Sequence, residues 1–231
     1  MIYSFIHQSK QFSIHYFDGT KFINETLKFH RLKKDQSTIF IKLLLGTILL
    51  NVQTRPNEGI GLYLDSKNFN FKIESNYKGH TRTLFSPKDL AECPELFSAN
   101  CMVSRIISPA KKSEIFRTHL QNIDTNLLIT TILKKIYSTN GRIITSSDQN
   151  SSILITKLPD SPNHTSISEK PPESITEFIS KINTNLIEIL NHDISQEYDL
   201  VILMKELDFK IRNRRAIELE PINNPLSFFN E

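Results

Sequence analysis

One stretch of the chain, Thr38–Val52, is apolar at nearly every position and is interrupted by Lys42, Gly46 and Thr47. A helix that is apolar around most of its circumference is usually buried on most of its sides. Ser37 stands immediately before this run and can accept a backbone N–H bond as its N-cap. We therefore predict that the run forms the central helix of a domain, with strands wrapped around it.

Hydrophobic patterning on both sides of this helix predicts short strands. Before it, β-forming residues at Ile2–Ile6 and Phe12–Phe17 indicate a strand pair, and near-helical spacing indicates a helix over Lys21–Leu32. After it, three segments are separated by short polar turns, at Gly59–Leu64, Phe69–Ser75 and His80–Phe85. Connections this short cannot join parallel strands, so these segments predict antiparallel hairpins.

The pattern then predicts further strands and a second apolar helix. The strands are expected at Met102–Ile107, Ile115–Leu120, Arg142–Thr145 and Ile153–Lys157. The helix is expected over Asn126–Tyr137, with Asp124 or Thr125 as its cap, and Pro87–Phe97 is expected to be a loop or a short helix. The predicted fold class is α+β, with mostly antiparallel sheets wrapped around an apolar central helix and a helical linker subdomain after them.

The composition changes at Pro159, where fourteen residues, 159–172, contain four prolines among polar side chains. Such a stretch is typical of a linker. It is followed by an amphipathic helix, Ser174–Asn191, a shorter helix, Tyr198–Leu207, and a tail from Phe209 that we expect to be irregular. We predict three parts: an α+β core domain over residues 1–158, a linker over 159–172, and a helical subdomain with its tail over 173–231.

The charge and the cysteine content do not indicate a nucleic-acid partner, a metal site or a redox role. The formal net charge is only +3 over 231 residues, which does not favour nucleic acid as a partner. The cluster Arg212–Arg215 could bind phosphate backbone or anionic lipid, but nearby acidic residues favour a solvated terminus. Cys93 and Cys101 do not form a metal-type pair, and we expect both to be reduced and structural.

Localisation is expected to be cytoplasmic. The N-terminus lacks a basic region leading into an apolar run, so no signal peptide is predicted. The apolar run Ile39–Val52 is shorter than the ~20 residues that a membrane span needs, and it contains Lys42. A buried helix therefore explains this run better than a membrane helix does.

The sequence contains none of the common catalytic or cofactor-binding motifs. None of the six glycines precedes a lysine, and Gly-x-Gly-x-x-Gly and Gly-x-Ser-x-Gly are absent. The seven histidines do not lie at metal-ligand spacing on any expected face. We therefore predict that the protein is not an enzyme and has no metal, cofactor or ATP requirement.

The order of the expected elements resembles the core of the thirty-three-kilodalton chaperonin family, a bacterial heat-shock class of redox-regulated holdases. The matching segments follow one another as they do in that family, at Ile41–Val52, Gly61–Leu64, Phe71–Arg82, Val103–Pro109, Phe116–Leu120 and Leu127–Asn140. The resemblance covers residues 1–158 well and the helical region more loosely. It implies an ATP-independent chaperone that binds unfolded proteins.

The sequence departs from this family in two respects. Its expected strand turns lack the family's glycine signatures, at 65–69 and 119–124. The family ends in a zinc domain built on Cys-x-Cys and Cys-x-x-Cys, and neither motif occurs in this sequence. We therefore expect a holdase-like protein without the cysteine and zinc redox switch.

Two functions are consistent with these observations. The first is a holdase whose client-binding surface is the apolar stripe of the amphipathic helix: Ile175, Phe178, Ile182, Leu186, Ile189 and Leu190. The structural alternative is that this stripe simply packs on the core sheet. The second function is that of a divergent paralogue acting as a dedicated protein-interaction or regulatory module. A homodimer is compatible with either function.

Overall fold

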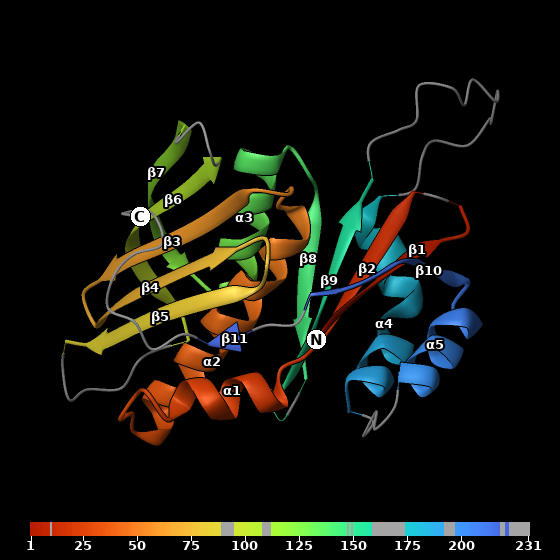
Figure 1. Cartoon of the computed structure of the whole chain (residues 1–231), viewed down its shortest axis with the longest axis horizontal. Helices are drawn as coiled ribbons and strands as arrows, with labels where there is room; N and C mark the ends of the chain where they lie inside the picture. The colour runs from red at the N-terminus through yellow and green to blue at the C-terminus, as the bar shows by residue number, and fades with distance from the viewer. Residues whose placement is uncertain are drawn as a thin grey trace.

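The computed structural model describes residues 1–9, 11–88, 95–107, 112–146, 148, 150–158, 174–191, 197–217 and 220–221. Two β-sheets and five helices make up the described part of the chain, mostly with antiparallel strand pairing, and this confirms the predicted α+β class. Figure 1 shows an alternation of layers: a sheet, a pair of helices, the second sheet, and a second pair of helices outside it.

The five-stranded sheet joins the two ends of the chain. Its strand order is β10 (Phe209–Ile217), β1 (Ile2–His7), β2 (Phe12–Asp18), β9 (Ser151–Lys157) and β8 (Gly141–Thr145), and all its pairings are antiparallel. The prediction of an irregular tail from Phe209 is therefore wrong for residues 209–217. That segment pairs with β1, roughly 200 positions earlier, which supplies the hydrogen-bond partners that a local pattern cannot reveal.

The six-stranded sheet is formed mainly by the middle of the chain. Its order is β11 (Glu220–Pro221), β5 (His80–Pro87), β4 (Phe69–Asn76), β3 (Glu58–Ser66), β6 (Phe97–Ile107) and β7 (Lys112–Ile123). All neighbours are antiparallel except the short β11, which lies parallel to the start of β5. The predicted hairpins are confirmed, although β6 begins at Phe97, the last residue of the expected loop or helix and well before the predicted strand start at Met102. The part of that segment at 89–94 lies outside the described residues.

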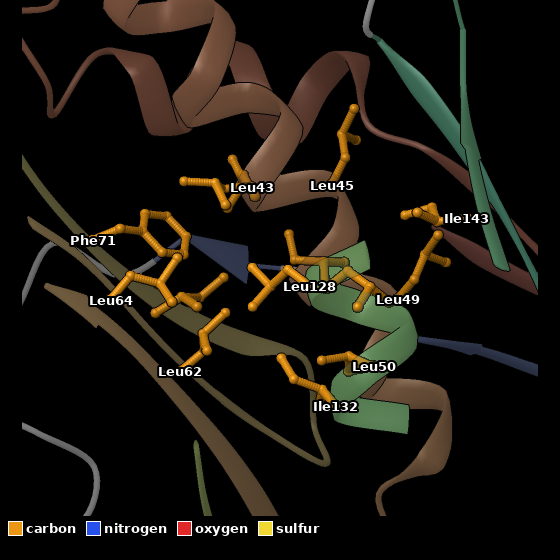
Figure 2. Packing of buried hydrophobic residues seen from close by; sticks show 14 of the residues in the cluster. Leu43, Leu45, Leu49, Leu50, Leu62, Leu64, Phe71, Leu128, Ile132 and Ile143 are labelled. Carbon is orange, nitrogen blue, oxygen red and sulfur yellow. The ribbon is translucent and has the colours of Figure 1, made fainter. Parts of the chain in front are cut away.

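The predicted central helix is confirmed. Helix α2 (Lys34–Leu49) continues into the 3₁₀ turn η1 (Leu50–Gln53), lies between the two sheets and packs on α3 (Thr125–Tyr137). Figure 2 shows its leucines meeting the six-stranded sheet and α3 in one buried cluster. The helix starts a turn before the predicted Ser37 cap: the Lys33 backbone N–H donates to the Gln36 side chain at 3.0 Å.

The remaining helices frame this core. Helix α1 (Thr20–Leu27) is shorter than predicted, and α3 is capped by Asp124, whose carboxylate accepts from the Leu127 amide at 2.7 Å. Helices α4 (Ile175–Asn191) and α5 (Glu197–Glu206) cover the outer face of the five-stranded sheet (Figure 1). Strand β2 is therefore buried at six successive positions, because both faces of its sheet are covered.

The apolar helix also meets the length and composition criteria for crossing a membrane. Residues Lys34–Gln53 have a mean hydropathy of 1.2, but 67% of that window is buried inside the protein. The core helix of a globular domain has the same properties, so this segment is weak evidence for a membrane span.

Candidate functional site

The predicted client-binding stripe lies at the interface between α4 and the five-stranded sheet. Phe178, Leu186, Ile189 and Leu190 are each less than 5% exposed, and Ile175 and Ile182 are partly buried beside them. The structure therefore brings all six predicted residues together on one helix face. In this arrangement the stripe faces the sheet and is covered, as the structural alternative expects.

The sheet contributes a matching apolar surface. It consists of alternate residues of β1, β2 and β9, which project away from α2 toward α4 and α5: Phe5, Phe12, Ile14, Tyr16, Ile153 and Ile155. Phe12 and Phe178 stack with ring centroids 3.9 Å apart and nearly parallel planes. His7 packs edge-on against Phe178 at 5.2 Å and against Phe209 at 5.1 Å, so it closes one end of the interface with aromatic contacts.

Several residues of this interface were missed by the sequence analysis. Ile179 of α4, Leu200 and Met204 of α5, and Phe209 of β10 are all less than 5% exposed in the same cluster. Ile179 follows Phe178 and widens the apolar face of the helix, so its position carried a usable signal. The positions of Leu200 and Met204 could not be recognised from the sequence, because the short helix α5 has no strongly one-sided apolar pattern.

Polar contacts between the helical unit and the sheet include two side-chain hydrogen bonds. The Ser151 hydroxyl donates to the Leu190 carbonyl at 3.2 Å, and the Gln8 side-chain amide donates to the Asp208 carboxylate at 3.0 Å. Burial and the charge of Asp18 raise the pKa of Tyr16 well above its ordinary value, so this phenol stays neutral. The interface is therefore held by apolar burial and by the β1–β10 ladder.

The described residues offer little for catalysis or metal binding. Within the described ranges, no group of three or more histidine, cysteine or acidic side chains is placed to hold a metal ion. Burial raises the pKa of the Cys101 thiol to about 12, so it is a poor nucleophile at neutral pH. Cys93 lies outside the described residues.

Comparison with known proteins supports the fold but not a family assignment. No family model and no curated protein matches the sequence. The crystal structure of a 33 kDa chaperonin (heat shock protein 33 homologue) from Thermotoga maritima matches with a TM-score of 0.61. The aligned sequences are 11% identical, and the match covers 89% of this chain and 74% of that chain. At this identity the likeness shows a shared fold, in agreement with the resemblance in element order.

Proposed function

We propose that this protein is an ATP-independent, holdase-like chaperone that binds partly unfolded proteins through apolar surface. The observation that carries this proposal is the second apolar cluster, in which a C-terminal helical unit covers a sheet face that includes Phe5, Phe12 and Tyr16. The fold shared with a 33 kDa chaperonin is a second, coarser support.

Separation of α4 and α5, together with β10, from the rest of the sheet would create the client-binding state. Both surfaces of the interface are apolar, so separation would expose two apolar patches together. Contiguous apolar surface of this kind binds other exposed apolar segments without sequence specificity, because water is released from both partners. Heat would favour such an opening, because the freed segment gains conformational entropy.

Control by oxidation is not part of this proposal. The sequence contains two cysteines, and the described one, Cys101, is buried between β3 and β7 in the six-stranded sheet, away from α4. Its raised pKa keeps the thiol protonated. We propose that opening responds to temperature, without the cysteine and zinc switch, and that the protein acts in the cytoplasm.

A disulfide lock tests the proposal. Ile6 of β1 and Lys210 of β10 are cross-strand neighbours, and opposite residues of an antiparallel pair lie within the ~4.4–6.8 Å between Cα atoms that a disulfide requires. We expect the unlocked protein to suppress light scattering by a thermally unfolding client enzyme at stoichiometric ratio. The oxidised Ile6→Cys/Lys210→Cys variant should lose most of that suppression and regain it after reduction.

A second cross-link serves as the matched control. Ser104 and Ile115 are neighbours across β6 and β7, in the sheet that α4 does not touch, and Ser104→Cys/Ile115→Cys should keep full suppression when oxidised. If the unlocked protein leaves client aggregation unchanged, the holdase proposal fails. A dedicated protein-interaction module would then be the better hypothesis for the function. Recovery of a single stoichiometric partner in a pull-down would support that hypothesis.

A further inference from the structure

The outer face of the six-stranded sheet carries a groove of about 770 Å³ that the proposed function does not use. This face is turned away from α2 and lies on the side of the molecule opposite α4 and α5 (Figure 1). The register of the strands determines which residues form the floor of the groove. Five residues stand side by side across five strands and form the middle row: Leu84, Lys72, Tyr63, Met102 and Arg117.

The dimensions of the middle row suit an extended chain. Five adjacent strands span four inter-strand spacings, or about 19 Å at ~4.8 Å each. An extended polypeptide of about six residues covers the same distance. The middle row is therefore long enough for one strand of peptide.

The apolar side chains of the middle row are at least partly exposed. The Leu84 side chain is 54% exposed, and Met102 and Tyr63 are only partly covered. Methionine has an unbranched, polarisable side chain that adapts to different partners. These three side chains would contact apolar side chains of a bound segment and would tolerate variation in their shape.

The charges of the groove are unbalanced toward positive. Asp65 is neutralised by Lys88, and Lys72 pairs with the buried Glu74 at 3.0 Å while its ammonium lies 5.1 Å from the Tyr63 ring centroid. Arg117 is exposed and forms no ion pair with the described residues. A guanidinium in this position is suited to receive a carboxylate in bidentate geometry.

A polar row runs beside the middle row and supplies hydrogen-bonding groups. It contains Asn70, Asp65, Asn100 and His119, aligned by the same register. The imidazole Nδ1 of His119 lies 2.9 Å from the Asn100 side-chain oxygen, which orients both groups. Side-chain amides both donate and accept, so they can bond the backbone of a peptide whatever its sequence.

We infer that this groove binds an extended polypeptide segment that carries apolar side chains and at least one carboxylate. The apolar side chains contact Leu84, Met102 and Tyr63, and the carboxylate pairs with Arg117. The polar row bonds the peptide backbone. This inference does not rest on the proposed holdase function, because it uses the opposite sheet.

Two fluorescein-labelled peptides test the inference. One is an eight-residue peptide of alternating glutamate with leucine or phenylalanine, and the other has lysine in place of each glutamate. Fluorescence anisotropy with the full chain should show at least tenfold tighter binding of the glutamate peptide. Arg117→Glu should remove that preference, and Leu84→Asn should weaken binding of the glutamate peptide severalfold.

The matched control is Arg142→Glu, which reverses an exposed strand arginine on β8 of the other sheet. It should leave both affinities within twofold of the parent. Equal affinity for the two peptides, or an unchanged preference in Arg117→Glu, overturns the inference. The inference is also overturned if the parent chain self-associates and Arg117→Glu abolishes that self-association, because a second copy of the chain would then occupy the groove.

Discussion

Phe178 makes the closest aromatic contact between the helical unit and the sheet. It is 4% exposed, stacks on Phe12 at 3.9 Å and meets Phe209 edge-on at 6.1 Å. We predict that Phe178→Ala lowers the free energy of unfolding by about 3 kcal/mol, because truncation of a buried phenylalanine leaves a cavity. Urea unfolding followed by circular dichroism measures this. Ile187→Ala, an exposed position on the same helix, should change it by less than ~0.5 kcal/mol.

The carboxylate of Glu58 illustrates a different residue-scale effect, a buried ion pair. It is 4% exposed and accepts from Arg105 Nη2 at 2.7 Å and from the Arg55 amide at 2.9 Å. Burial by itself raises the pKa of Glu58, but the hydrogen bonds and charges of Arg105 and Arg55 outweigh burial, so its pKa lies below the ordinary value. A depressed folded-state pKa stabilises the protein above the unfolded-state pKa of ~4.3, and this contribution is lost as pH falls through the folded-state pKa.

We therefore predict that Glu58→Gln costs about 2 kcal/mol at neutral pH, because Arg105 loses its charged partner in a mostly buried position. The variant should also lose less stability than the parent between about pH 5 and pH 3, since the titrating group is gone. Urea midpoints across this range measure both effects. Glu188→Gln, an exposed position on α4, should change the free energy of unfolding at neutral pH by less than ~0.5 kcal/mol. A Glu58→Gln profile parallel to the parent's would contradict the assignment.

At the scale of elements, the packing of α2 on α3 depends on Gly46. A Cβ at this position would lie 2.9 Å from Ile129 Cγ1 and 3.1 Å from Thr125 Cγ2 of α3. Alanine favours helix by ~1 kcal/mol over glycine, but overpacking a core costs ~1–3 kcal/mol. We predict a net loss of about 1 kcal/mol for Gly46→Ala, measured by urea unfolding. Adding Ile129→Val should cost less in the Gly46→Ala background than in the parent, whereas strict additivity would rule out the contact.

Helices and short strands were well predicted from the sequence because their signals are local. The apolar run of α2 and the alternation of β4 both reflect burial on identifiable faces. The pairing of β10 with β1 was not predictable in this way, since it depends on a contact between the two ends of the chain. The basic residues of 210–215 favoured a solvated tail over a strand, although an edge strand tolerates charged side chains.

The stripe on α4 and the groove on the six-stranded sheet also differ in whether a local sequence pattern can predict them. The stripe on α4 was found from sequence because six residues on one helix need only a helical period to share a face. The groove on the six-stranded sheet was not found, because its middle row takes one residue from each of five strands. Only the register of four strand pairs brings those residues together, and register is a property of the assembled sheet.

At the scale of the whole molecule, the layered arrangement predicts an order of opening. Helix α2 is enclosed between two sheets, whereas α4 and α5 cover one outer face and are joined to it by apolar contacts and one strand ladder. Regions with fewer covering contacts open at lower free energy than the global core. We predict that backbone amides of α4, α5 and β10 exchange together, at lower free energy than those of α2 and α3.

Hydrogen exchange measured by mass spectrometry at low urea concentrations tests this order, with peptides from 175–191 compared with peptides from 39–50. A single cooperative opening of the C-terminal unit would expose the sheet face that contains Phe5, Phe12 and Ile14 while α2 stays protected. The oxidised Ile6→Cys/Lys210→Cys variant should raise the opening free energy of α4 and leave that of α2 nearly unchanged. Equal opening free energies for α4 and α2 in the parent would mean that the two layers unfold as one unit. In that case the interface could not open separately to receive a client.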